Sequence, residues 1–228
     1  MASGTGRAGS ANKRSTRRGR RAYRKRNALP AIALFTLLCL AAAAVWFKVA
    51  AEEATIADAI HCRPEATPPA GTSFSPQGRS ALNDTVPLPP SEITVRVRNA
   101  TDTFGLANRT SNTLEELGIG KLKKPTNDPA YEEREPQCYG QIRFGPQSKA
   151  AARTISLIDP CLELVATSRE TAVINLVLGA DFSGIHISDA TRTILETLRE
   201  WNNSERVEAT AGPSIEPKLL SKARDAYC

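Results

Sequence analysis

The chain has 228 residues, of which 41% are hydrophobic and 5% aromatic, which is enough for one domain of ordinary size with appendages. Its net charge of +6 is unevenly divided, because residues 1–27 hold ten Lys or Arg and no acid. With these residues and Lys48 set aside, 19 basic residues stand against 24 acidic ones. The basic character belongs to the N-terminal block, and the remainder does not have the composition of a nucleic-acid-binding domain.

A single membrane-spanning helix is predicted over residues 28–50. Residues 28–47 contain no charge and would extend about 30 Å as a helix, the thickness of a bilayer core. Trp46 and Phe47 end this stretch, where aromatic rings favour the membrane interface. Because the basic block precedes the span, we expect residues 1–27 to form a cytoplasmic tail and the rest to lie outside the plasma (inner) membrane.

This N-terminus has two alternative interpretations. Small residues at 49–54 resemble a signal-peptidase site, so the span could be a cleaved signal peptide, but its long charged region and its length favour an uncleaved anchor. The basic block could also bind nucleic acid, yet no aromatic platform accompanies it. We interpret the block as an orientation signal with some attraction to anionic lipid.

Residues 51–91 are predicted to form an extracytoplasmic stalk. Their second half is rich in proline with Gly, Ser and Thr between, a composition typical of extended linkers. We expect this stalk to hold the following domain away from the membrane, within or near a cell wall.

A folded domain is predicted over residues 92–202, and its first half opens with a strand. Residues 93–99 alternate apolar and polar side chains, the signature of a half-buried strand. A helix is expected over 102–117, ended by Gly118. Residues 119–123 suit an edge strand because lysines discourage edge pairing, and residues 125–137 read as a polar connection.

The second half of the domain is organised around residues 138–161. Residues 139–144 alternate as a strand, and residues 148–158 carry apolar side chains on one helical face. The strand advances about 20 Å and the helix returns by about 18 Å, which predicts that Cys138 and Cys161 lie near one another.

A strongly apolar strand at 171–179 completes the main elements, with residues 161–165 left as an extension. The order predicts an α+β fold, a split β-α-β-β-α-β two-layer sandwich with its helices on one face of a small sheet. An amphipathic helix is expected at 189–201, followed by a polar C-terminal tail at 203–228.

Three stretches of the domain resemble the LytR C-terminal domain family, and within it actinobacterial envelope proteins: VRVRNATDTFGLANRTSNTLEELG, CYGQIRFGPQSKAAARTISLIDPCLELV and INLVLGADF. The resemblance covers about residues 60–228. It implies a single-pass membrane protein with its domain outside, needed for a sound cell envelope and not known to be an enzyme. Larger relatives carry a separate phosphotransferase domain that attaches polymers to peptidoglycan, and that domain is absent here.

Four cysteines follow the predicted span, and the resemblance implies that they are structural: Cys62, Cys138, Cys161 and Cys228. An even number in an oxidising compartment predicts two disulfides, and four cysteines permit three connectivities. The returning strand and helix favour Cys138–Cys161, which leaves Cys62–Cys228 by elimination. Cys39 lies inside the span and is interpreted as a small apolar residue.

No recognisable catalytic or metal motif stands in the sequence, so we expect neither an enzyme nor a cofactor. There is no C-x-x-C pair and no G-x-S-x-G elbow, and only His61 and His186 could assist a metal. Asp128, Glu132 and Glu133 are interpreted as a solvated charge cluster.

A binding surface is predicted on the sheet face opposite the helices, where Arg96, Arg98, Tyr139, Gln141 and Arg143 would meet if their strands are neighbours. Guanidinium, phenol and amide groups suit an anionic glycan, a lipid phosphate or an acidic loop of a partner. The alternative is a solvated or covered sheet face. The leading hypothesis is a non-catalytic anchored protein that supports envelope integrity by contacting other envelope proteins. The alternatives are a module that binds cell-wall glycan or polysaccharide, and an envelope phosphotransferase.

Overall fold

The computed structural model describes residues 29–132, 135–203 and 212–224, and it divides into two compact units at Lys48/Val49. The first helix, α1, spans Leu29–Ile60. Its window Ala31–Lys48 has a mean hydropathy of 2.1 and is long and apolar enough to cross a membrane. A helix of this length and composition agrees with the predicted anchor.

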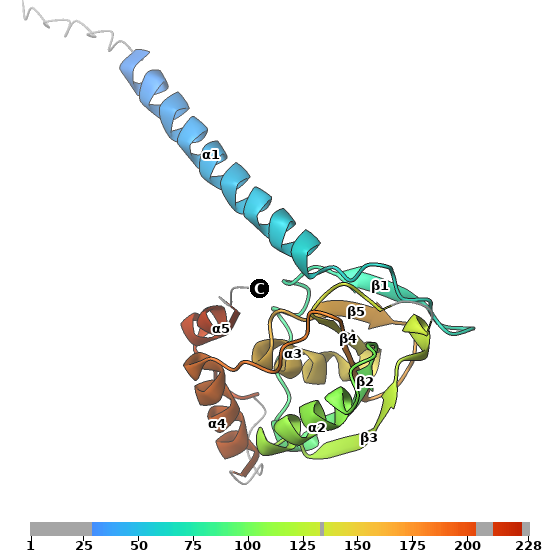
Figure 1. Cartoon of the computed structure of the whole chain (residues 1–228). Coiled ribbons are helices and arrows are strands. Elements are labelled where there is room, and N and C mark those ends of the chain that lie inside the picture. The colour runs from blue at the N-terminus through green and yellow to red at the C-terminus, as the bar shows by residue number, and fades with distance from the viewer. Residues whose placement is uncertain (1–28, 133–134, 204–211, 225–228) are drawn as a thin grey trace, which may run out of the picture. The chain divides into compact units, whose positions relative to one another are not determined.

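The second unit is built on one six-stranded sheet of order β1-β5-β4-β6-β2-β3 (Figure 1). The inner strands β2 and β6 run parallel, β4 runs antiparallel to β6, and β5 runs parallel to β4. The outer strands are β3, parallel to β2, and β1, antiparallel to β5. In chain order the strands span Phe74–Gln77, Thr94–Asn99, Lys121–Asn127, Gly140–Phe144, Glu163–Thr167 and Val173–Leu178.

The predicted α+β class is confirmed, and the predicted order corresponds to β2-α2-β3-β4-α3-β6. The helices α2 and α3 span Leu106–Glu116 and Lys149–Ile158. The structure adds two strands to the expected set. The extension after α3 becomes β5, and β1 comes from the segment expected to be a stalk.

The main core lies between the sheet and the helices on one of its faces. Alternate residues of β2, β4 and β6 point into it, including Val95, Ile142 and Leu176, all completely or almost completely buried. Leu114 of α2 and Ile155 of α3 pack against them. The other face therefore receives the alternate, mainly polar side chains of the same strands.

Strand β4 begins with Gly140 and is followed by Gly145, and a side chain at either position would require the neighbouring backbone to shift. Gly140 has φ +155°, and a Cβ there would lie 2.4 Å from the carbonyl oxygen of Val177. A Cβ on Gly145 would lie 2.0 Å from the carbonyl oxygen of Arg169. Both glycines let a neighbouring backbone approach closely.

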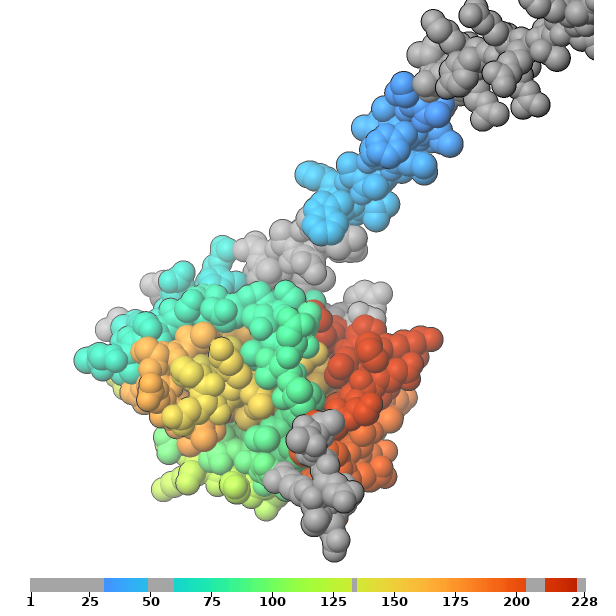
Figure 2. Space-filling model, turned by 180° about the vertical axis from the view of Figure 1, so that it is seen from behind, coloured from blue at the N-terminus to red at the C-terminus, as the bar shows by residue number. Residues whose placement is uncertain are grey.

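Residues 61–91, here called the strap, pack on the domain instead of forming an extended stalk. The strap contributes β1 to the sheet and Leu82 to the core, and the backbone N–H of its Leu88 donates to the carbonyl of Ala150 in α3. Figure 2 shows its blue-green second half running between α3 (yellow) and α5 (red). The strap packs on the domain because apolar residues scattered among its prolines can be buried. Its overall composition, which is rich in proline and polar residues, did not indicate this packing.

The C-terminal part packs as a second, smaller cluster. The amphipathic helix α4 spans Asp189–Asn203, close to the prediction, and α5 spans Pro217–Arg224. Leu198 of α4 and Ala223 of α5 are buried against Leu157 of α3. Part of the predicted polar tail is therefore folded onto the domain.

The predicted disulfide pairing is wrong, because Cys62 is bonded to Cys138. The strap runs beside the start of β4, where the backbone N–H of Gln137 donates to the carbonyl of Arg63 at 2.7 Å. This bridge brings the Cα atoms of the two cysteines to 4.8 Å, a normal disulfide spacing. Neither Cys138–Cys161 nor Cys62–Cys228 can then form. Cys161 is disulfide-bonded as well, and Cys228 lies outside the described residues.

Candidate functional site: the polar face of the sheet

Strand register brings four of the five predicted surface residues to the face opposite the helices. Arg96 of β2 and Arg143 of β4 lie on either side of Asn175 of β6. Two residues further along β6, Arg98 of β2 and Gln141 of β4 lie on either side of Val177. These residues are neighbours because β6 separates β2 from β4.

The fifth residue, Tyr139, lies elsewhere. Its ring packs against Phe182 with centroids 5.0 Å apart, and its hydroxyl donates to the carbonyl of Gly184. The alternation expected from residue 139 onward starts only after Gly140, whose positive φ turns the chain. Tyr139 therefore contributes to the helix side of the sheet.

Arg143 forms the centre of the polar face, and it is buried with 4% of its surface exposed. Its Nη1 lies 2.7 Å from Oδ2 of Asp128, which is equally buried. The guanidinium carbon is 4.5 Å from the ring centroid of Phe74 in β1 and 5.4 Å from that of Tyr131. Two aromatic rings and one carboxylate therefore compensate this buried cation.

A chain of hydrogen bonds leads from Arg143 to the strap. Its Nε donates to Oε1 of Gln141 at 2.9 Å, and Nε2 of Gln141 donates to Oε2 of Glu163 at 2.7 Å. Glu163 also receives the backbone N–H of Cys62 at 3.3 Å and lies 2.5 Å from Nδ1 of His61. These polar groups join β4 and β5 to the start of the strap, and they close this part of the predicted surface.

Arg98 lies at the more open end of the face and is half-buried. Its Nε donates to Oδ1 of Asn175 at 2.8 Å, and its Nη1 is 3.9 Å from Oδ1 of Asp128. Burial lowers the pKa of the Arg98 guanidinium, Asp128 opposes that shift, and the nearby cations Arg96 and Arg143 reinforce it.

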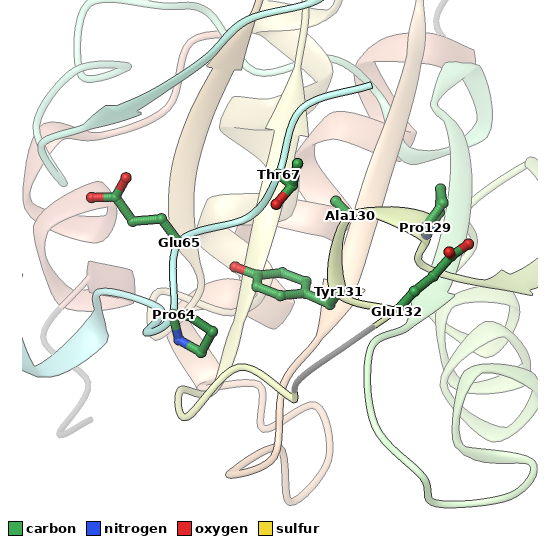
Figure 3. Close-up of a pocket in the computed structure, with 7 residues that line it drawn as sticks. All are labelled: Pro64, Glu65, Thr67, Pro129, Ala130, Tyr131 and Glu132. Atoms are coloured by element: carbon green, nitrogen blue, oxygen red, sulfur yellow. The ribbon is translucent and has the colours of Figure 1, made fainter. Parts of the chain in front are cut away.

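A groove of about 520 Å³ lies between the strap and the short helix η2, Pro129–Tyr131. Figure 3 shows the ring of Tyr131 between the two segments, with the carboxylates of Glu65 and Glu132 at opposite ends. Burial raises the pKa of Tyr131 to about 12, so its hydroxyl stays protonated at neutral pH. A second hollow of about 320 Å³ shares Tyr131 and Glu132 and adds the acids Asp102, Asp128 and Glu135.

A separate polar cluster, formed by Asp159, Tyr139 and His186, lies near the start of β4. Asp159 is 3% exposed, and its Oδ1 accepts the backbone N–H of Cys161 at 3.1 Å. Burial raises the pKa of Asp159 to about 6, although that hydrogen bond, Tyr139 and His186 lower it. Burial likewise raises the pKa of Tyr139. Among the described residues, no group of three or more His, Cys, Asp or Glu is placed to hold a metal ion.

Sequence reasoning missed the residues that tie this face together: His61, Phe74, Asp128, Tyr131 and Glu163. The sequence pattern suggests a solvated Asp128, but this residue lies between β3 and η2 and is buried. The sequence feature that could have pointed to these residues is the pair of arginines on the polar side of residues 93–99. Arginines on a covered sheet face need buried carboxylates, which must come from other segments.

Comparison with known proteins agrees with this architecture. Residues 92–182 match the LytR C-terminal family, described as LytR cell envelope-related transcriptional attenuator. The cell envelope integrity protein Cei of Mycobacterium tuberculosis is 32% identical over 213 residues, covering 91% of this chain and 93% of that protein.

A solved structure is also similar. It is the soluble domain of a conserved hypothetical secreted protein from Mycobacterium marinum, with a TM-score of 0.58 and 32% identity, covering 68% of this chain and 97% of that one. The match extends over nearly the whole solved domain, so the likeness covers more than one motif. The chain therefore belongs to the family of the cell envelope integrity protein Cei, and its residues 92–182 form a LytR C-terminal domain.

Proposed function

We propose that the protein is a non-catalytic, membrane-anchored component of the cell envelope that supports envelope integrity by contacting another envelope protein. Family membership supports the envelope-associated role. The apolar helix α1 supports the anchor, and the basic block before it supports an extracytoplasmic domain.

The groove between the strap and η2 is the observation that carries the contact function. It is open to solvent at Glu65 and Glu132, and acids continue from it into the adjoining hollow. Carboxylates at both ends of a groove suit a partner segment with basic side chains. The chain's own basic block is expected on the other side of the membrane, so a second protein would supply these cations.

The non-catalytic part of the proposal rests on how the buried carboxylates are used. Asp128 is paired with Arg143, and Glu163 is shared by Gln141, His61 and a backbone N–H. Both groups hold the strap and η2 against the sheet, a structural use that leaves neither poised as an acid or base.

Complementation in a host that lacks its own copy of the gene tests the groove. The full chain with Glu65→Lys and Glu132→Lys should reach normal abundance yet fail to restore resistance to detergent. The matched control reverses two exposed acids elsewhere, Glu116→Lys and Glu196→Lys, and should restore resistance. Full complementation by the groove variant would exclude this groove as the contact surface.

Retention on purified cell-wall sacculi separates a protein partner from a glycan. A protein-contact function predicts that the full chain in detergent washes off sacculi at moderate salt, since a charge-based contact is screened. Salt-resistant retention that is lost in the groove variant would instead favour the glycan-binding alternative.

Enzyme fusions test the orientation. Alkaline phosphatase, which is active only outside the cytoplasm, should be active when fused after Cys228 and inactive when fused before Met1. The reverse pattern would contradict an extracytoplasmic domain.

A further inference from the structure

A third and much smaller pocket opens on the polar face, beside the groove but separated from it by η2. Its volume is about 70 Å³. The polar side chains in its wall come from five strands or their ends and from one turn: Arg98, Asp128, Arg143, Thr167, Arg169, Thr171 and Asn175. We call it the arginine pocket.

The fold fixes the positions of its three arginines. Arg98 and Arg143 stand on β2 and β4 with Asn175 of β6 between the two strands. Arg169 lies in the turn between β5 and β6. Its own backbone carbonyl packs against Gly145 and accepts the N–H of Thr171 at 3.0 Å. A turn held by backbone contacts presents Arg169 at a defined place on the rim.

Positive charge in the pocket exceeds negative charge. Asp128 is the single carboxylate among the lining residues, and it lies 2.7 Å from Arg143 and 3.9 Å from Arg98. No acidic side chain of the described residues pairs with Arg169. Repulsion from the neighbouring guanidiniums adds to burial in lowering the pKa of Arg98. An anion in the pocket would relieve this imbalance.

One donor of a lining residue has no hydrogen-bond partner among the described residues. Arg143 is 4% exposed, and its Nη2 is buried with no hydrogen-bond acceptor among the described residues. Buried donors in folded proteins are nearly always paired, and each exception calls for an explanation such as a ligand. The hydrogen-bonding capacity of the Arg143 guanidinium is therefore not fully used within the described residues, and an anion bound beside it would add the negative charge that this end of the pocket lacks.

We propose that the arginine pocket binds a phosphate group carried by an envelope molecule. Guanidinium groups bind phosphate through paired, charge-assisted hydrogen bonds, and the hydroxyl of Thr171 and the amide of Asn175 add further donors. The pocket is far below the several hundred Å³ of sites that enclose a drug-sized ligand. It therefore takes the anionic group alone and leaves the rest of the molecule outside. This proposal does not depend on the function proposed for the groove.

Calorimetric titration of the full chain with inorganic phosphate, in a neutral maltoside detergent, tests the site. Arg169→Gln should weaken phosphate binding by about tenfold, the loss of a hydrogen bond to a charged group. Thr171→Val should weaken it by a smaller factor. Arg192→Gln removes an exposed arginine on α4 and should leave the affinity unchanged. Mapping of the Cys62–Cys138 bond in each variant verifies the fold.

Two soluble phosphates then identify the source of the group. Glycerol 3-phosphate represents a lipid headgroup, and glucose 6-phosphate represents a phosphorylated wall polymer. Tighter binding of the first assigns the pocket to lipid, and tighter binding of the second assigns it to polymer. Absence of phosphate binding by the unmodified chain would overturn the proposal, as would equal weakening by Arg169→Gln and Arg192→Gln.

Discussion

The carboxylate of Asp128 lies 2.7 Å from the guanidinium of Arg143, and both side chains are buried beneath the strap and η2. Asp128 directly follows the edge strand β3 and Arg143 stands in β4, so the pair connects two strands that β2 and β6 separate in the sheet. Within the polar face, this pair supplies the counterion of the buried Arg143.

Neutralising one partner of this pair should destabilise the domain strongly. Asp128→Asn leaves Arg143 charged and buried without its counterion, and we expect a loss of about 3–5 kcal/mol in the free energy of unfolding. Urea denaturation of the full chain in detergent measures the loss. Asp102→Asn, at an exposed acid nearby, is the control and should cost less than about 0.5 kcal/mol. Equal stability of the two variants would show that the pair is not needed.

The observed disulfide predicts a specific peptide map. Non-reducing proteolysis should release a peptide pair that joins Cys62 to Cys138, and we expect the remaining cysteines after α1, Cys161 and Cys228, to form the second pair. The first bond spans 76 residues, so replacing both of its cysteines with serine should cost about 4 kcal/mol on the chain-entropy estimate. Cys39→Ser should leave the stability unchanged. A Cys138–Cys161 peptide pair would contradict the structure.

The buried carboxyl of Asp159 predicts a pH-dependent stability. Its folded pKa of about 6 lies above the ordinary value of 3.8, so the protonated form is favoured in the folded state. The stability from this group is complete below about pH 4 and is lost as pH rises through 6, with a cost on the order of 3 kcal/mol at neutral pH. Asp159→Asn should therefore stabilise the protein at pH 7.5 and have little effect at pH 4.

Urea denaturation at these two pH values measures this dependence. Asp181→Asn, at an exposed acid, serves as the control and should change the stability little at either pH. A benefit of Asp159→Asn that is the same at both pH values would show that ionisation of Asp159 is not its source.

Gly145 should not tolerate a side chain. An added Cβ would overlap the carbonyl oxygen of Arg169, a backbone atom that cannot move without shifting the β5–β6 turn. We expect Gly145→Ala to cost about 2–3 kcal/mol by this overpacking, whereas Gly78→Ala has open space around its Cβ and should cost less than about 1 kcal/mol. Thermal unfolding of both variants compares them, and similar melting temperatures would argue against the close approach.

Much of the sheet and its helices could be predicted from the sequence because half-buried elements leave a periodic signal. The strand predicted at 93–99 and the helix predicted at 148–158 agree within about a residue with β2 and α3. Residues 119–123 were correctly expected at an edge, although β3 extends to Asn127 through a proline that an edge strand tolerates. The helix predicted over 102–117 begins only at Leu106, because Gly105 adopts a left-handed conformation just before it.

The strap and the polar network could not be predicted in this way. β1 is four residues long and contains Pro76, so its pairing with β5 leaves no periodic pattern. The alternation of β2 and β4 placed Arg98 and Arg143 on one face but gave no indication that Phe74 and Tyr131 cover it. Whether a sheet face is open depends on contacts between distant segments, and the disulfide was misassigned for the same reason.

The bond between Cys62 and Cys138 also decides where a mechanical load would enter the domain. Cys62 follows α1 by two residues, and Cys138 stands just before β4, an inner strand. Tension that arrives along the chain from the N-terminal side passes through the sulfur bridge to β4. Without the bridge it would reach β1 first and could peel that edge strand from β5. A chain joined to an inner strand resists separation of the sheet from its edge, which would suit the membrane-anchored role proposed above.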